Sequence, residues 1–215
     1  QEGAPARVTL ENGETLSADA VVLGTAGQSQ SLPGLGWLPL KHIRGQVSYC
    51  QATDASRRWQ QAQCHGGYLT PVLKELHCVG ATFKLHEDHT HATDSDDEEN
   101  LAQLRHHLPA LWQELGGEHI QIVDRRVAFR CQSIDFLPLC GPLPVATDNP
   151  HRPAQGLYLN VAHGSRGITG TPLCAELIAE MICGQPLPMD QEMIDALAPA
   201  RFILRKRKKQ PEWMP

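Results

Sequence analysis

The segment "NVAHGSRGITGTPLCAELIAEMICG", residues 160–184, decides the fold that we predict for this chain. An apolar run ends there in small residues, and a glycine-rich turn leads into a stretch with the apolar spacing of a helix. Arg166 lies in that turn, between Ser165 and Gly167, where an ordinary helix start carries a small polar cap and acidic residues. This order predicts a strand, a tight turn and a helix whose N-terminus faces a molecule outside the chain.

The predicted turn is suited to an anion, or to an atom that becomes negative during a reaction. A helix N-terminus presents free backbone N–H groups and the positive end of the helix dipole. Gly164, Gly167 and Gly170 allow another molecule to approach the backbone closely. The segment has neither a Walker lysine nor a complete G-x-G-x-x-G, so a tight turn with a surface arginine is the structural alternative.

Composition indicates an ordinary globular chain of 215 residues, with 41% hydrophobic and 20% charged residues. A net charge of −5 excludes a chain that is basic throughout for nucleic acid. The 7 cysteines form no C-x-x-C pair, which predicts free thiols in a reducing, cytoplasmic location. No apolar run approaches the ~18 residues of a membrane span, so we expect no membrane partner. The opening "QEGAPARVTLENGETL" reads as the middle of a longer protein.

Strand and turn signals fill most of the remaining sequence. Asn12-Gly13 predicts a hairpin, and "AVVLGTAG", residues 20–27, predicts a buried strand that ends in small residues. Ser95 with Glu98 indicates a capping box for a helix that Pro109 ends or kinks. Strands in meander order, one inserted helix and a terminal strand–turn–helix predict an α+β fold, with both chain ends in one domain and the middle in another.

Together, "AVVLGTAG" and residues 160–184 resemble the glycine oxidase and D-amino-acid oxidase (DAO) family of FAD-dependent oxidoreductases. In that family, a similar strand end lies beside the flavin and the terminal helix points its N-terminus at it. A closer resemblance is to the oxidoreductase part of bifunctional proteins of tRNA 5-methylaminomethyl-2-thiouridine biosynthesis. Five segments carry it in order: "GGYLTP", "HCVGATF", "VAFRCQSIDFLPLCGPLP", "HGSRGITGTPLCAELIA" and "PLPMD…ALAPARF".

The resemblance implies a fragment of a DAO-like FAD-dependent oxidoreductase, with an antiparallel-sheet substrate domain and the C-terminal part of a Rossmann-like FAD domain. Residues 1–44 would belong to the FAD domain, 45–140 to the substrate domain, 141–200 to the return into the FAD domain, and 201–215 to a basic tail. No β–α–β unit with G-x-G-x-x-G precedes Arg7. We therefore expect the isolated fragment to be inactive.

Site residues follow from the same resemblance. Tyr68 matches an active-site tyrosine, Arg130 an arginine that reaches the substrate carboxylate, and Arg166 the arginine of the flavin-facing turn. The residues expected to bind FAD are Thr25, Ala26, Gly27, Gly45, Gln46, Gly164, Ser165, Arg166, Gly167 and Ile168. The chain departs from the simple amino-acid oxidases at Cys131, where many have proline, and in a shorter turn around Arg166.

The implied reaction acts on a CH–NH group. FAD would support removal of the carboxymethyl group from 5-carboxymethylaminomethyl-(2-thio)uridine at the tRNA wobble position, giving 5-aminomethyluridine and glyoxylate. Arginine suits the carboxylate because its planar guanidinium forms two parallel hydrogen bonds. A fused methyltransferase domain, outside this chain, would use S-adenosylmethionine. Two alternatives stay open: a glycine, sarcosine or D-amino-acid oxidase, and a non-catalytic binding fragment.

Three further features are given structural interpretations. His86, His89 and His91 lie in a polar loop, so we predict no metal site. Asp135 is expected to cap a turn. Residues 201–210 carry six basic residues and no acid, which indicates a solvated tail, with a phosphate-binding patch as the alternative.

Overall fold

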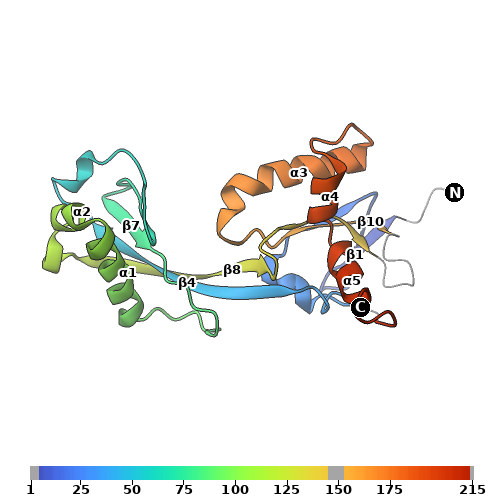
Figure 1. The fold of residues 1–215 in the computed structure, drawn as a ribbon, viewed down its shortest axis with the longest axis horizontal. Coiled ribbons are helices and arrows are strands. Elements are labelled where there is room, and N and C mark those ends of the chain that lie inside the picture. The colour runs from blue at the N-terminus through green and yellow to red at the C-terminus, as the bar shows by residue number, and fades with distance from the viewer. Residues whose placement is uncertain (1–4, 145–152, 214–215) are drawn as a thin grey trace. The chain divides into compact units, whose positions relative to one another are not determined.

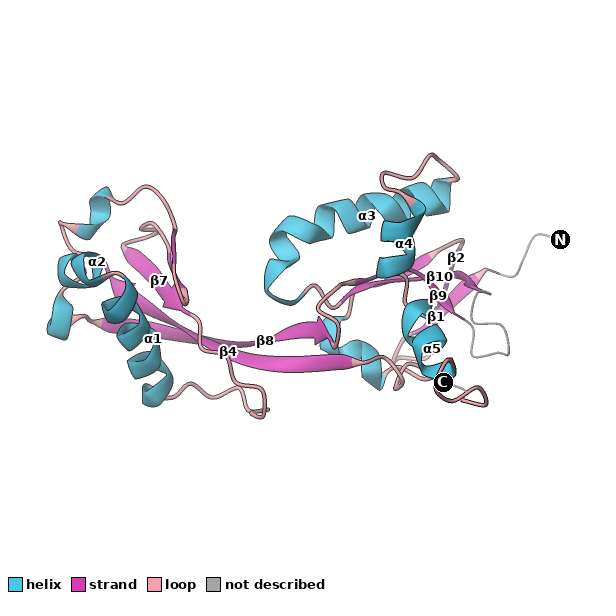
Figure 2. Ribbon diagram, in the orientation of Figure 1, coloured by secondary structure: helices cyan, strands magenta, loops and turns pink. Residues whose placement is uncertain are grey.

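The structure is a computed structural model that describes residues 5–144 and 153–213, and its internal contacts divide the chain into two units (Figure 1). Unit 1 comprises Gln1–His42 and Arg130–Pro215, and unit 2 comprises Ile43–Phe129. Helices and largely antiparallel sheets occur together, as the α+β prediction requires (Figure 2). No helix in the described ranges combines the length and the apolar character needed to cross a membrane.

Unit 1 contains a three-stranded sheet in the order β3 (Val21–Leu23), β10 (Pro153–Val161), β9 (Leu139–Pro144). β3 runs parallel to β10, with Leu23 opposite Leu159, and β9 runs antiparallel to it. The hairpin of β1 (Ala6–Thr9) and β2 (Thr15–Ala18) confirms the Asn12-Gly13 turn. Gly13 has a φ of 85°, which glycine adopts without steric cost.

Helices cover both faces of this sheet (Figure 1). α3 (Gly167–Cys183) and α4 (Gln191–Leu197) pack on the face that carries Cys140 and Tyr158. Leu139 and Leu159 point to the opposite face because successive residues of a strand alternate. They pack there with Phe202 of α5 (Ala200–Arg207). α3 ends at Gly184, whose left-handed conformation is typical of a glycine C-cap.

The basic run does not begin as a solvated tail. Arg201, Phe202 and Ile203 are buried, with exposed fractions of 5%, 9% and 1%. The tail interpretation is wrong for these residues because Phe202 packs in the unit 1 core and Arg201 pairs with Asp135. Only the later part of the run, Arg205, Lys206, Lys208 and Lys209, is exposed.

Unit 2 is built on a five-stranded sheet with two helices. The strand order is β5 (Gln63–Cys64), β6 (Tyr68–Leu69), β7 (Leu76–Gly80), β4 (Leu40–Gln51), β8 (Ile122–Ser133). Short 3-10 turns lie at Ser56–Arg58 and Gly117–His119. α1 (Asp94–His107) and α2 (Pro109–Glu114) cover the sheet through a core of Cys50, Leu69, Val79, Leu104, Trp112 and Leu115.

The inserted helix differs from its prediction at one end. Thr93, not Ser95, is the N-cap of α1, and its Oγ1 accepts a hydrogen bond from the Asp96 backbone N–H at 3.3 Å. Thr93 can do so because its extended backbone leaves the helix path one residue before Asp94. Pro109 begins α2 directly after α1 ends, which confirms the predicted break.

The internal contacts assign residues 130–140 to unit 1, whereas the predicted bounds at 44 and 140 place them in the substrate domain. Cys131 and Leu139 pack in the unit 1 core, and the Ile134 backbone N–H donates to Pro39 O at 3.2 Å. The sequence alone presents this stretch as a strand followed by a turn, and such a pattern does not say which core the strand enters.

Candidate functional site

The strand–turn–helix of residues 160–184 forms as expected, through a backbone of unusual conformation. β10 ends at Val161, Ala162 and Gly164 have positive φ values of 66° and 58°, and η4 (Gly164–Arg166) leads into α3. A left-handed alanine costs roughly 1 kcal/mol, so surrounding contacts must hold it. Gln132 supplies one such contact, because it pairs with His163 in an isolated β-bridge.

The N-terminus of α3 has no side-chain cap. Arg166 occupies the N-cap position without a capping hydrogen bond, and the first turn contains no acidic residue. The Thr169 hydroxyl turns away from the free N–H groups and donates to Arg166 O at 3.0 Å. Ile168 is 96% exposed, an uncommon position for a large apolar side chain. The first backbone N–H groups and this apolar side chain are thus available to a ligand.

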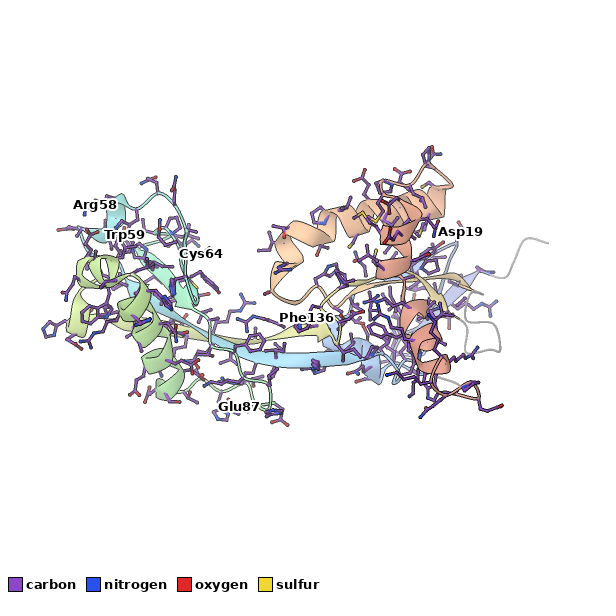
Figure 3. The ribbon with its side chains drawn as sticks, in the orientation of Figure 1. Asp19, Arg58, Trp59, Cys64, Glu87 and Phe136 are labelled. Carbon is purple, nitrogen blue, oxygen red and sulfur yellow. The ribbon has the colours of Figure 1, made fainter. Side chains whose placement is uncertain are left out.

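A pocket of about 410 Å³ adjoins this helix start. The residues around it come from the end of β8, the turn after it, the turn before α3 and the first turn of α3: Gln132, Phe136, Leu137, Pro138, His163, Gly164, Ser165, Arg166, Thr169 and Gly170. Phe136 is 73% exposed and is labelled in Figure 3. The sequence patterns did not single out Gln132, Phe136 or Thr169, since none of them belongs to a local motif.

His163 is a half-buried residue in the lining of this pocket. Its Nε2 is 2.8 Å from Asn160 Oδ1, and its Nδ1 is buried without a hydrogen-bond partner in the described residues. Burial lowers the pKa of His163, and a hydrogen bond that His163 donates to Asn160 opposes that effect only in part. The unpartnered ring nitrogen is a polar group whose burial is costly unless a bound molecule satisfies it.

Asp135 fixes the turn that carries Phe136. Its Oδ1 accepts hydrogen bonds from the Ser133 hydroxyl at 2.9 Å and from the Leu137 backbone N–H at 3.4 Å, which confirms the predicted turn cap. Arg201 adds a bidentate ion pair that the sequence did not reveal. Burial alone would raise the pKa of Asp135, but hydrogen bonds from Arg201, Arg205 and Ser133 hold it well below its usual range.

The predicted flavin-side strand end lies at the same sheet edge as the α3 turn. β3 and β10 are parallel neighbours, so Thr25–Gly27 and residues 162–167 both follow carboxyl ends of adjacent strands. Thr25 Oγ1 lies 2.8 Å from Ser29 Oγ at the start of η1 (Ala26–Ser31). A Cβ at Gly27 would come within 2.4 Å of His42 Nε2, so a larger residue would displace that imidazole.

Gln46 is fully buried within unit 2, and Gly45 beside it is also buried. The Gln46 side-chain Nε2 donates to Thr93 O at 2.8 Å and to Asp97 Oδ1 at 2.9 Å. Its Oε1 accepts from the Thr93 backbone N–H at 2.9 Å. This amide holds the start of α1 against β4, so any contact of Gly45 and Gln46 with FAD would have to come from the backbone.

Tyr68 lies half-buried on β6, opposite Gly80 of β7. Burial raises the pKa of the nearby Cys78 thiol, and a hydrogen bond from Tyr68 opposes this rise. Arg130 is half-buried and belongs to unit 1, whereas Tyr68 belongs to unit 2. Joint action of Tyr68, Arg130 and Arg166 on one substrate therefore stays a prediction.

The histidine loop shows no metal-binding group, and neither does any other described segment. The rings of His89 and His91 stack at 3.7 Å, and their backbone carbonyls accept hydrogen bonds from the buried Arg44 side chain at 3.0 and 2.7 Å. Arg44 also pairs with Asp96 at 2.7 Å. These contacts give the loop a structural role at the start of α1.

Comparison with known proteins places the site in a family context. Proteins named tRNA 5-methylaminomethyl-2-thiouridine biosynthesis bifunctional protein are similar to this chain. The one from Chromobacterium violaceum is 38% identical over 222 residues, covering 94% of this chain and 34% of that protein. The one from Pseudomonas aeruginosa is 38% identical over 207 residues, covering 87% and 32%. The chain thus spans about a third of the length of these curated relatives.

Solved structures show the same fold. Glycine oxidase from Geobacillus kaustophilus has a TM-score of 0.72 at 20% identity, covering 91% of this chain and 49% of that one. Iminodiacetate oxidase from Chelativorans sp. BNC1 has a TM-score of 0.69 at 20% identity, covering 85% and 47%. The family model described as DAO, FAD dependent oxidoreductase, matches residues 1–181. The chain therefore belongs to the DAO family of FAD-dependent oxidoreductases.

Proposed function

We propose that this chain is the part of a tRNA-modifying enzyme that removes the carboxymethyl group from 5-carboxymethylaminomethyl-(2-thio)uridine at the wobble position. The products are 5-aminomethyluridine and glyoxylate. The observation that carries the proposal is the uncapped N-terminus of α3 with Arg166 beside a pocket. The names of the relatives from Chromobacterium violaceum and Pseudomonas aeruginosa support tRNA as the substrate class. A fused methyltransferase domain using S-adenosylmethionine belongs to the same proposal.

The residues of the site fit FAD. The free N–H groups of α3 suit an electronegative ring edge, and the exposed Ile168 suits a flat apolar surface. Thr25–Gly27, at the neighbouring strand end, and Gly164–Ile168 would hold the ring between them. When bound, FAD would supply the hydride acceptor for oxidation of the carbon between the substrate nitrogen and its carboxylate, and hydrolysis of the resulting imine by water would release glyoxylate and leave the amine on the tRNA.

The chain supplies binding and orientation. Arg130 and Arg166 bind the substrate carboxylate, since a guanidinium matches a carboxylate with two parallel hydrogen bonds. Tyr68 donates a hydrogen bond that orients the same group. The positive end of α3 stabilises negative charge that develops in the pocket. Burial lowers the pKa of His163, which favours the neutral imidazole beside the start of α3.

Two other functions use the same residues. A free glycine, sarcosine or D-amino-acid oxidase would also need an arginine for the carboxylate, and a non-catalytic fragment would retain only the recognition surface. The exposed basic residues of α5 favour a substrate that carries phosphates over a free amino acid.

The test uses the full-length protein with FAD under anaerobic conditions. Transfer RNA that bears the carboxymethylaminomethyl group is added, and the flavin absorbance is followed. Bleaching by this tRNA, but neither by tRNA with an aminomethyl group nor by free glycine, is the expected result. Bleaching by free glycine alone would establish the amino-acid oxidase instead. Failure of the full-length protein to bind FAD would support the non-catalytic binding function.

A further inference from the structure

A second pocket, of about 650 Å³, lies in unit 1 beside α5. It is lined by Gly36, Trp37, Pro39, Ile134, Asp135, Phe202, Arg205, Lys206, Lys209 and Trp213. None of these residues lines the pocket at the start of α3. The proposed reaction therefore leaves this second pocket without a role.

Three aromatic side chains give the pocket flat apolar walls: Trp37, Phe202 and Trp213. The segment after α5 folds back and is fixed by backbone contacts. The Trp213 backbone N–H donates to Gln210 O at 3.0 Å, and the Arg207 side-chain Nε donates to the Trp213 backbone O at 3.1 Å. Lys206 Nζ lies 3.9 Å from the centre of the Trp213 ring. A tryptophan so placed offers a ring face next to a positive charge.

The charge of the pocket opposes that of the chain as a whole, whose net charge is −5. Arg205, Lys206 and Lys209 line it, and Asp135 is its one acidic lining residue. Asp135 is already neutralised by Arg201 and Arg205. Within the described residues, no carboxylate forms an ion pair with Lys206 or Lys209. The rim is therefore electropositive and its two lysines are available to an anion.

We propose that this pocket binds RNA, with a base stacked on Trp213 or Trp37 and the flanking phosphates paired with Lys206 and Lys209. Aromatic rings beside unpaired cations are the combination that binds unstacked nucleotides, since bases stack on the rings and phosphates meet the charges. An acidic peptide would use the lysines and leave the tryptophans unexplained. The inference rests on the proposed function, in which tRNA is the substrate, and places in this pocket a nucleotide other than the one that is modified.

The experiment measures binding of fluorescein-labelled tRNA to the full-length protein by anisotropy, over a range of salt concentrations. Trp213→Ala is expected to weaken binding about tenfold, and Trp213→Phe to retain most of the affinity. Lys206→Gln and Lys209→Gln should each weaken it several-fold and lower the salt slope by about 1. Lys208→Gln is the matched control, because Lys208 is exposed in the same run but does not line the pocket. Its binding should change by less than about twofold.

Three outcomes would overturn the inference. Trp213→Ala could bind normally, Lys208→Gln could weaken binding as much as its neighbours do, or poly-glutamate could compete as well as RNA does. Circular dichroism of each variant identifies a loss of fold, and Trp213→Phe then provides the decisive comparison. If modified tRNA fails to bleach the flavin while Trp213→Ala still weakens tRNA binding, the proposed reaction fails and the RNA pocket stands. If modified tRNA bleaches the flavin of the full-length protein and Trp213→Ala binds tRNA normally, the proposed reaction stands and the RNA pocket is rejected.

Discussion

Arg201 and Asp135 form a bidentate ion pair, with Nε to Oδ2 at 3.0 Å and Nη2 to Oδ1 at 2.9 Å. Arg201 also donates to Leu197 O at 2.8 Å and to Leu137 O at 3.0 Å. The pair joins α5 to the turn that carries Phe136, and so links the two pockets of unit 1 through one carboxylate. We expect substitutions at this pair to affect stability first and ligand binding as a consequence.

Replacement of Arg201 by methionine should lower the free energy of unfolding by about 3 kcal/mol, because the partly buried Asp135 loses its bidentate partner. Arg205→Met is the matched control. Arg205 pairs with the same carboxylate, but its side chain is 55% exposed, so its loss should cost less than about 1 kcal/mol. Urea unfolding of both variants measures the difference. Equal losses of unfolding free energy in the two variants would show that the buried pair contributes no more than the exposed one.

Stability should decline in acid because of Asp135. Its folded pKa is held below the unfolded value, which is near 4, so the stabilisation is present above that pH and is lost as the pH falls through the folded pKa. The wild-type protein should therefore lose stability more steeply than Asp135→Asn as the pH falls from about 4 to about 2. Unfolding free energies measured across that range test this. Parallel curves for the two proteins would contradict it.

Gly164→Ala should destabilise the turn before α3. A Cβ at this position meets Gln132 Oε1 at 3.2 Å, and the φ of 58° disfavours any side chain. We expect a loss of about 1 kcal/mol together with weaker FAD binding. Gly170→Ala is the control, since its Cβ would meet nothing within 4 Å and alanine favours a helix. Thermal unfolding and flavin titration of both variants distinguish an effect on the turn from an effect on the helix.

Arg166→Lys should reduce kcat/KM for the modified tRNA roughly a hundredfold, because lysine keeps the charge and loses the bidentate geometry. Arg166 is exposed and forms no ion pair with a carboxylate of the described residues, so the unfolding free energy should not change. Steady-state kinetics and urea unfolding are measured on the same preparation. Full activity of Arg166→Lys would show that Arg166 does not form the two-hydrogen-bond contact with the substrate carboxylate.

Tyr68→Phe tests the hydroxyl in two ways. Burial raises the pKa of the Cys78 thiol and the Tyr68 hydroxyl opposes this, so the variant should raise that pKa further and slow alkylation of Cys78 at a fixed pH. If Tyr68 also orients the substrate, kcat/KM should fall about tenfold. Peptide-resolved mass spectrometry separates Cys78 from the exposed Cys64 and Cys183. Slower alkylation with unchanged kinetics would leave Tyr68 a purely structural role.

Features that depend on neighbouring residues could be predicted from the sequence. The Asn12-Gly13 hairpin, the break at Pro109 and the cap at Gly184 each follow from a few adjacent residues. The capping box at Ser95 failed because Thr93, two residues earlier, offered an equally suitable hydroxyl. Local chemistry permitted both caps, and the packing of α1 against Gln46 selected one.

The sequence by itself determined the strand, the glycine-rich turn and the helix that starts after Arg166, because hydrophobic spacing and backbone freedom act within a few residues. Only the tertiary structure decided that β3 lies beside β10, that Asp135 meets Arg201 across a separation of 66 residues, and that Trp37 and Trp213 line one pocket. Such contacts depend on how separate segments pack to bury apolar surface. No local pattern specifies the partner in advance, so the basic run could be recognised from the sequence while the pocket that it helps to form could not.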